Sequence, residues 1–233
     1  MFNNKFISAV IVAAGSSTRM KSAVSKQLLK IGKKTVLEHT VSAFAQSDIV
    51  DEIIVVCPQA DKESFEQLFI NNNFCNYSTP LKFTVGGSTR QQSVRNGVLL
   101  LSDDADYIAV HDGARPLIKT EHIKAVVSDA VEFGAATLAV PVKDTVKIAE
   151  NLTVQSTPPR DKLYLIQTPQ VFEKNNYTRA YEKAGSENLD FTDDCQLVEL
   201  TGGKVHITIG DYTNIKITTA EDIAVAEAFL KMR

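Results

Sequence analysis

Short apolar runs rich in β-branched residues alternate with amphipathic segments through the first two thirds of the chain, and this alternation limits the possible folds most. The apolar runs span residues 6–13, 52–57, 82–85, 106–110 and 135–140. Between them, apolar side chains recur near helical spacing, as in the segments 35–45 and 90–101. Strands that alternate with helices of this length form βαβ units. The pattern therefore predicts an α/β fold, with a mainly parallel sheet and helices on both faces.

The end of the sequence predicts one more helix. Thr219-Ala220-Glu221-Asp222 resembles a capping box, and apolar residues follow at helical spacing on one face. These residues are Ile223, Ala226, Phe229 and Leu230. We expect this helix to close the fold, so that residues 1–233 form a single domain.

The stretch from Pro141 to about Leu165 does not fit the alternation of strands and helices. Polar and apolar residues alternate from Lys143 to Ile148, and Pro158-Pro159 follows. We interpret residues 141–165 as a β-arm that projects from the body. A second copy of the chain would cover its free strand edges and apolar side chains, so we predict a homodimer.

Composition excludes several classes of protein. The 233 residues are 44% hydrophobic and 23% charged, which is typical of a globular chain and not of a disordered one. The net charge of −3 provides no basic field for nucleic acid. The apolar run at residues 9–14 is far shorter than the roughly 20 residues of a membrane span. The three cysteines show no CxxC spacing, which favours a reducing, cytoplasmic location.

The first segment with a chemical signature directly follows the run at residues 6–13. Small residues there would let backbone N–H groups approach phosphate oxygens, and two cations follow. The segment has neither the GK[ST] of a P-loop nor the three glycines of a dinucleotide fold, so by itself it is equally consistent with a surface turn. Its small residues are Ala13, Ala14, Gly15 and Ser16, and its cations are Arg19 and Lys26.

A second segment, GGSTRQQSV, leads from a predicted strand into a predicted helix. Gly86 and Gly87 would permit close approach to a flat base, whose edge could bond to Ser88, Thr89 or Ser93. The alternative is that Ser88 or Thr89 caps the helix. Without other evidence the two interpretations are about equally supported.

A third segment, VHDGARP, lies at the carboxyl end of a predicted strand, where ligands bind in open α/β sheets. Asp112 could hold Mg²⁺ against triphosphate oxygens, supported by Arg115, or it could simply begin a turn. The neighbouring His111 has no histidine partners at metal-ligand spacing. We interpret all four histidines as structural or exposed.

An ordered set of motifs resembles the 2-C-methyl-D-erythritol 4-phosphate cytidylyltransferase family over nearly the whole chain: AAGSSTRM, SKQ, LEHTV, GGSTRQQSV, VHDGARP, PVKDTVK, QTPQVF, TDD and TNIKIT. The chain departs from the family at Ser17, where a second glycine is usual, and at Ser25, where proline is common. The resemblance implies a Rossmann-like nucleotidyltransferase domain whose β-arm exchanges contacts across a homodimer. It implies transfer of the cytidylyl group of CTP to the polyol phosphate, with release of pyrophosphate, in non-mevalonate isoprenoid precursor synthesis.

The resemblance also implies roles for individual residues. The catalytic residues are Arg19, Lys26, Arg160 and Lys216, and Asp112 holds Mg²⁺ or another divalent cation. The nucleotide-binding residues are Ala13, Ala14, Gly15, Ser16, Gly86, Gly87, Ser93 and Ala114. The substrate-binding residues are Arg115, Thr145, Thr168 and Thr192, and Thr145 and Arg160 reach in from the partner's arm. Asp211 aligns imperfectly with the family's carboxylate near the last motif, so no metal role is predicted for it.

Three other functions are compatible with parts of the sequence. Ribitol 5-phosphate cytidylyltransferase shares the layout, although HDGARP and PVKDTVK are more similar to the erythritol-phosphate branch. A glycosyltransferase would need a DxD motif after a central strand, whereas Asp104-Ala105-Asp106 precedes its predicted strand and reads as a solvated turn. A noncatalytic nucleotide-binding protein would not need Arg19, Lys26, Arg160 and Lys216 together.

Overall fold

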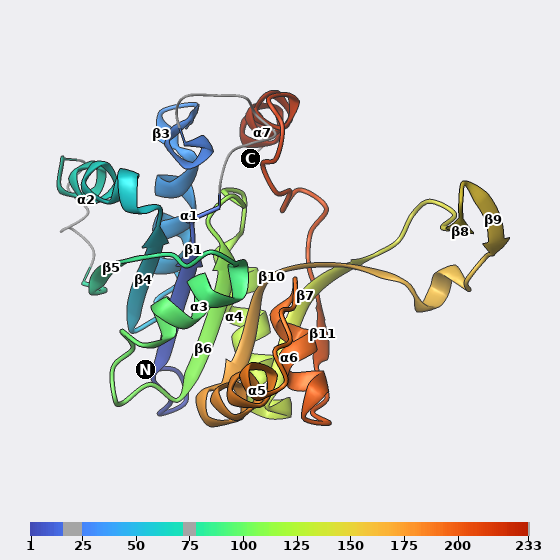
Figure 1. Cartoon of the computed structure of the whole chain (residues 1–233). Helices are drawn as coiled ribbons and strands as arrows, with labels where there is room; N and C mark the ends of the chain where they lie inside the picture. The colour runs from blue at the N-terminus through green and yellow to red at the C-terminus, as the bar shows by residue number, and fades with distance from the viewer. Residues whose placement is uncertain (16–24, 72–77, 233) are drawn as a thin grey trace.

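The computed structural model describes residues 1–15, 25–71 and 78–232. Helices cover a central sheet, and a long arm projects to one side (Figure 1). Within the described residues the sheet has seven strands in the order β11-β7-β10-β6-β1-β4-β5. Strand β10 runs antiparallel to both of its neighbours, and the other strand pairs are parallel. The strands are β1 (Ile7–Val12), β4 (Glu52–Cys57), β5 (Leu81–Val85), β6 (Tyr107–Asp112), β7 (Ala135–Pro141), β10 (Tyr164–Glu173) and β11 (His206–Ile209).

The strands expected from the apolar runs are all present, with closely similar bounds. Strands β10 and β11 were not predicted. In β10 the pairing register shifts between Ile166 and Gln170, and Pro169 lies in the shifted part. A proline inside a segment ordinarily argues against a central strand, because it cannot donate to the ladder.

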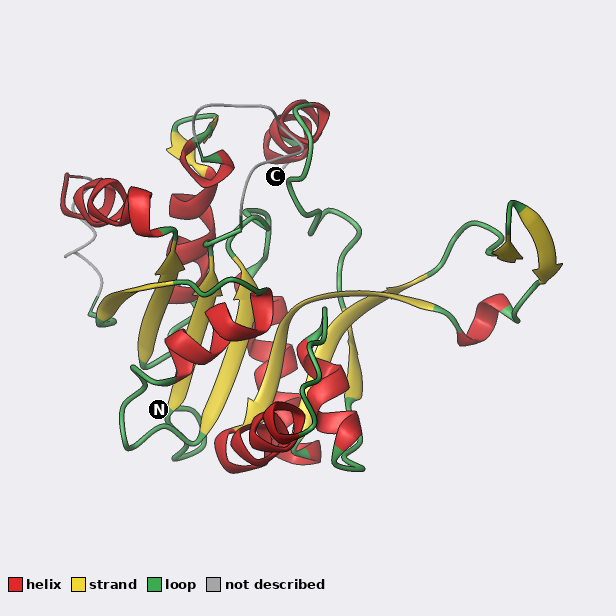
Figure 2. Ribbon diagram, viewed as in Figure 1, coloured by secondary structure: helices red, strands yellow, loops and turns green. Residues whose placement is uncertain are grey.

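Helices lie on both faces of the sheet, as predicted (Figure 2). Successive side chains of β1 alternate between two cores: Ile11 packs in the same cluster as Phe44 of α1, and Val10 in the same cluster as Val94 of α3. Helix α3 comes so close that a Cβ on Gly97 would lie 2.5 Å from Val10 Cγ1. The helices are α1 (Val36–Ala45), α2 (Lys62–Asn71), α3 (Arg90–Val98), α4 (Thr120–Phe133), α5 (Lys174–Ser186), α6 (Asp194–Leu200) and α7 (Glu221–Lys231).

Two helix boundaries show how the local sequence ends or begins an element. Helix α1 begins with a full capping box, in which Thr35 Oγ1 accepts from the Glu38 backbone N–H and the Glu38 carboxylate accepts from that of Thr35. Helix α3 ends at Val98 and not at the predicted residue 101. Its last turn tightens, because Leu100 N–H bonds to the Gly97 carbonyl and Leu101 N–H to that of Val98.

The predicted capping box of α7 forms in part, and the helix itself is confirmed. The helix begins at Glu221, and Ala220 at the N-cap has no side chain that could accept a hydrogen bond. The Asp222 carboxylate accepts from the backbone N–H groups of Thr218 and Thr219, at 2.7 and 2.8 Å, and the bond from Thr219 is the one that a capping box predicts for this carboxylate. The carboxylate therefore satisfies N–H groups just before the helix, and Ala226 anchors the apolar face as expected.

The β-arm is confirmed and leaves the body between the end of β7 and the start of β10 (Figure 1). It contains the hairpin of β8 (Ile148–Glu150) and β9 (Thr153–Ser156) and the short 3-10 helix η5 (Arg160–Lys162). Its side chains are largely exposed, including the apolar side chain of Val154, at 56%. Because β7 is parallel to β6, the arm departs from the carboxyl edge of the sheet.

Smaller elements complete the described chain. They are β2 (Lys30–Ile31), β3 (Lys34–Thr35) and the 3-10 helices η2 (Lys26–Leu28) and η3 (Gln59–Asp61). Among the helices that the structure describes, none has the length and apolar character needed to cross a membrane.

Candidate active site

The carboxyl edge of the sheet carries a buried carboxylate surrounded by cations. Asp112, the last residue of β6, is 7% exposed. Its Oδ2 lies 2.8 Å from Lys216 Nζ and 3.6 Å from Arg115 Nε, and its Oδ1 lies 3.6 Å from Arg90 Nε. Burial alone would raise the pKa of Asp112, but the charges of these three side chains outweigh it and hold that pKa well below its usual range. The carboxylate is therefore ionised at neutral pH, with positive charge gathered around it.

Arg90 is a member of this cluster that the sequence analysis missed. It is the first residue of α3, and its guanidinium also pairs with Asp194. Asp194 in turn accepts a 2.8 Å hydrogen bond from the Tyr177 hydroxyl. Burial would lower the pKa of Arg90, but Asp194 and Asp112 raise it above its ordinary value. The sequence carried one signal for a site role of Arg90: it begins the predicted helix that directly follows the glycine pair Gly86-Gly87.

Backbone and amide contacts hold three of the predicted residues together. Arg115 Nη1 donates to the Asn214 carbonyl at 2.7 Å, and Asn214 Nδ2 donates to the Thr168 carbonyl at 3.0 Å. Thr168 Oγ1 accepts from the Asp112 N–H at 3.1 Å. These bonds join the end of β6, strand β10 and the loop of Lys216. The structure thus brings Asp112, Arg115, Thr168 and Lys216 into one site.

His111 has a structural environment, as the sequence analysis proposed. It is fully buried, and its two ring nitrogens lie 3.0 Å from Thr168 Oγ1 and 3.3 Å from the Arg115 carbonyl. Burial lowers the pKa of His111 from 6.5 to about 3. The ring is therefore neutral at physiological pH and positions Thr168 beside Asp112.

The buried neutral His111 predicts acid sensitivity of the fold. Below pH 6.5 His111 is protonated in the unfolded chain, whereas in the folded chain it stays neutral until about pH 3. Proton binding therefore favours the unfolded chain, and the free energy of unfolding falls as the pH falls. We expect His111→Asn to reduce the slope of unfolding free energy against pH by about 1 kcal/mol per pH unit between pH 6 and 5. Urea unfolding at several pH values measures this slope. An unchanged slope would contradict the prediction.

Most of the predicted nucleotide-binding residues that the structure describes also gather at the carboxyl edge. A Cβ on Gly86 would lie 2.3 Å from Ala14 Cβ and 2.8 Å from Ser93 Oγ, so only glycine fits between them. Gly87 N–H donates to Ser93 Oγ at 3.1 Å. A Cβ on Gly113 would lie 3.1 Å from Ala13 Cβ, which brings the β1 loop against the segment that contains Ala114.

The N-cap of α3 is one of the hydroxyl residues for which the sequence allowed either helix capping or contact with a base. Thr89 is the N-cap, and its Oγ1 accepts from the Gln92 N–H at 3.2 Å. Ser93 Oγ donates to the Thr89 carbonyl at 2.9 Å and faces Gly87. Thr89 therefore has a structural role, whereas Ser93 lies against the glycine pair.

The remaining predicted site residues belong to three parts of the chain: residues 15–26, the β-arm, and the segment before α6. Arg19 and Ser16 lie outside the described residues, and Gly15 is exposed at the end of the first described range. Lys26 begins η2 beside α1 and is 9% exposed. The remaining three are exposed: Thr145 and Arg160 on the β-arm, and Thr192 just before α6.

Within the part of the chain that the structure describes, no cluster of three or more metal-ligating side chains is present. Asp112 offers one ionised carboxylate, the ligand type that Mg²⁺ prefers. Because three cations surround it, a metal there would need substrate phosphates and water as its other ligands. Asp211 is committed elsewhere: it bonds to Lys119 Nζ and the Thr213 N–H, at 2.7 and 2.8 Å, and these contacts lower its pKa to about 2.

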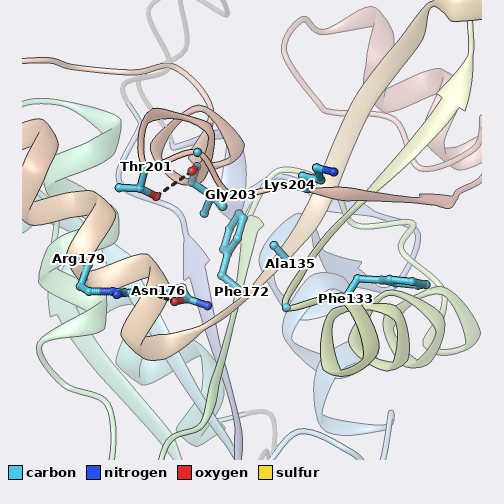
Figure 3. Close-up of a pocket in the computed structure, with 11 residues that line it drawn as sticks. Phe133, Ala135, Phe172, Asn176, Arg179, Thr201, Gly203 and Lys204 are labelled. Atoms are coloured by element: carbon cyan, nitrogen blue, oxygen red, sulfur yellow. Dashed lines mark hydrogen bonds between the residues drawn. The ribbon is translucent and has the colours of Figure 1, made fainter.

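Two features lie at the opposite edge of the sheet. Asp106 precedes β6 and accepts hydrogen bonds from the Phe6 N–H and Lys5 Nζ, so the DxD segment is a turn, as predicted. A cavity of about 360 Å³ opens beside the start of β7 (Figure 3). Its lining includes Phe172, Arg179 and Lys204 and contains none of the predicted site residues.

An open, mainly parallel sheet with small-residue loops and a cation-bound carboxylate at its carboxyl edge defines an α/β protein of the nucleotide-binding class. The family model described as IspD, 2-C-methyl-D-erythritol 4-phosphate cytidylyltransferase, matches residues 7–232. The chain belongs to this family.

Individual relatives agree over nearly the full length. The 2-C-methyl-D-erythritol 4-phosphate cytidylyltransferase of Caldanaerobacter subterraneus is 45% identical over 226 residues, which cover 97% of this chain and 99% of that protein. The protein of the same name from Clostridioides difficile is 41% identical and covers 97% and 94%. The crystal structure of 4-diphosphocytidyl-2C-methyl-D-erythritol synthase from Anaerococcus prevotii superposes with a TM-score of 0.87 at 35% identity, over 98% of this chain and all of that one.

Proposed function

We propose that this chain is the cytidylyltransferase that joins CTP to 2-C-methyl-D-erythritol 4-phosphate. The products are 4-diphosphocytidyl-2-C-methyl-D-erythritol and pyrophosphate, in non-mevalonate isoprenoid precursor synthesis. The observation that carries the proposal is the family match over residues 7–232, together with Asp112 and its three cations at the carboxyl edge of the sheet.

The chemistry requires cations more than it requires a base. An oxygen of the polyol phosphate attacks the α-phosphorus of CTP, and the bond from that phosphorus to the β-phosphate oxygen breaks. The phosphate monoester is already anionic at pH 7, since its second pKa is about 6. The protein must therefore bring two polyanions together and neutralise the charge that develops on the α-phosphoryl oxygens.

We assign each part of this reaction to particular residues of the chain. Arg19 and Lys26 neutralise the transferring phosphoryl group, and Lys216 and Arg160 position the attacking phosphate. Asp112 would hold Mg²⁺, which supplies further charge neutralisation on the triphosphate. Ala13, Ala14, Gly15, Ser16, Gly86, Gly87, Ser93 and Ala114 bind the nucleotide, and Arg115, Thr145, Thr168 and Thr192 bind the polyol phosphate.

The assembly that we propose is a homodimer of single-domain chains in the cytoplasm. Thr145 and Arg160 are exposed on the β-arm, and this arm projects away from the body of its own chain (Figure 1). Exposed apolar side chains on the arm, such as Ile148 at 55%, support its docking on a second copy. In this arrangement the arm of one copy completes the site of the other.

Pyrophosphate release tests the function. The purified protein is incubated with CTP, Mg²⁺ and either 2-C-methyl-D-erythritol 4-phosphate or ribitol 5-phosphate. We expect release with the erythritol phosphate at least tenfold faster than with the ribitol phosphate. Preference for ribitol 5-phosphate would overturn the substrate assignment, and no release with either acceptor would overturn the activity.

Arg160→Ala should mainly impair use of the second substrate. Removing one charged contact to phosphate should raise KM for the polyol phosphate about tenfold, with KM for CTP nearly unchanged. Lys162→Ala, an exposed cation in the same 3-10 helix, is the matched control. Steady-state kinetics with each substrate varied in turn measures the effect, and unchanged KM for the polyol phosphate would argue against a role for the arm.

A further inference from the structure

A tyrosine outside the proposed machinery contacts the base of the β-arm. Tyr212 Oη donates to the Pro141 carbonyl at 2.7 Å, where β7 ends and the arm begins. The ammonium of Lys143 lies 3.5 Å from the centroid of the Tyr212 ring. A cation at this distance over an aromatic face is attracted by the ring. We call these two contacts of Tyr212, with Pro141 and Lys143, the arm-base contact.

The arm-base contact continues to a residue with a proposed role in the reaction. Arg160 Nη1 donates to the Lys143 carbonyl at 3.0 Å, across the two segments of the arm. Beside it, Val142 N–H donates to the Leu163 carbonyl at 3.1 Å. Lys143 thus lies between Tyr212 on one side and Arg160 on the other.

The body holds the loop of Tyr212 in place. The Asp211 carbonyl accepts from Gln167 Nε2 at 2.9 Å, and the Asp211 carboxylate pairs with Lys119 at 2.7 Å. Further along the same loop, Lys216 pairs with Asp112. The arm-base contact therefore ties the arm to a loop that is anchored both on the helix side and at the candidate active site.

We propose that Tyr212 is a positioning residue for the transfer reaction. Together with Lys143 it sets the direction in which the β-arm leaves the body, and so places Arg160 and Thr145 at the site of a second copy. Tyr212 acts through the arm, because its hydroxyl is committed to Pro141 and its ring to Lys143. This proposal rests on the proposed function and on the exchange of arms between copies.

Two conservative variants separate the two contacts. Tyr212→Phe keeps the ring and removes the hydrogen bond to Pro141, and Lys143→Gln keeps the hydroxyl bond and removes the cation. Each should raise KM for the polyol phosphate about three- to fivefold, with kcat and KM for CTP within about twofold of wild type. The double variant should show the larger increase.

The chain offers a matched control pair. Arg95 lies over the Tyr181 ring, 5.7 Å from its centroid, between helices α3 and α5 and away from the arm. Tyr181→Phe and Arg95→Gln should therefore leave KM for the polyol phosphate unchanged. An equal rise in KM for both substrates in Tyr212→Phe, or no rise at all, would overturn the proposal.

Hydrogen exchange tests the arm-base contact without using activity. Mass spectrometry should show faster exchange in Tyr212→Phe at residues 141–147 and 160–166, and no change there in Tyr181→Phe. Unchanged exchange at the arm base would overturn the positioning role even if the enzyme is active. If exchange is faster in Tyr212→Phe but the wild-type protein transfers no cytidylyl group, the arm-base contact is supported and the proposed function is overturned.

Discussion

We expect Asp112→Asn to lower kcat/KM for cytidylyl transfer by about a thousandfold or more. The substitution removes the charge that holds Lys216, Arg90 and Arg115 around one point, and it removes the carboxylate proposed to hold Mg²⁺. Loss of a single preorganised electrostatic contact costs about a hundred- to a thousandfold in rate, and here several contacts depend on one side chain. Steady-state pyrophosphate release with CTP and the polyol phosphate measures the effect.

Asp106→Asn is the control for Asp112→Asn, because Asp106 is also a carboxylate paired with a lysine, at the opposite edge of the sheet. We expect its activity to remain within about fivefold of wild type. Breaking a buried ion pair can cost about 3–5 kcal/mol of stability, so urea unfolding of each variant must show that the assays use folded protein. Retention of more than a tenth of wild-type activity by folded Asp112→Asn would contradict the central role of this carboxylate.

Lys26→Ala should lower kcat about a hundredfold or more. Lys26 begins the 3-10 helix η2, and its side chain is largely buried. A cation at that position is proposed to neutralise the charge that develops during transfer, which a neutral side chain cannot do. Rapid-quench measurement of a single turnover with saturating CTP isolates this step from product release.

Lys30→Ala is the control for the loss of a positive charge near Lys26, because Lys30 lies on strand β2, which follows η2, and its side chain is exposed. It should leave the single-turnover rate nearly unchanged. A decrease of less than about threefold in Lys26→Ala would remove Lys26 from the catalytic role.

Local patterns predicted most of the fold. The apolar run at residues 52–57 became β4 with the expected bounds, and all of its side chains are buried. Such runs are readable because a strand between two layers of helices must be apolar on both faces. The β-arm was predicted because polar and apolar residues alternate there without a neighbouring helix pattern. In the structure the residues of its hairpin are exposed.

Elements that depend on distant partners were harder to predict. Strand β10 exists because β6 and β7 pair with it on both sides, despite Pro169 within it. The hydrogen bonds that define β10 follow from three-dimensional placement, which residue order does not show.

The sequence by itself determined the class of fold, the family resemblance and the residue types available for phosphate chemistry, because these depend on local periodicity and ordered motifs. Only the tertiary structure showed that Asp112 is shared by Lys216, Arg115 and Arg90, and that Tyr212 contacts the base of the arm. Lys216 and Arg90 are far from Asp112 in the chain, as Tyr212 is from Pro141. Their meeting depends on the order of parallel strands, whose carboxyl ends converge at one edge of the sheet.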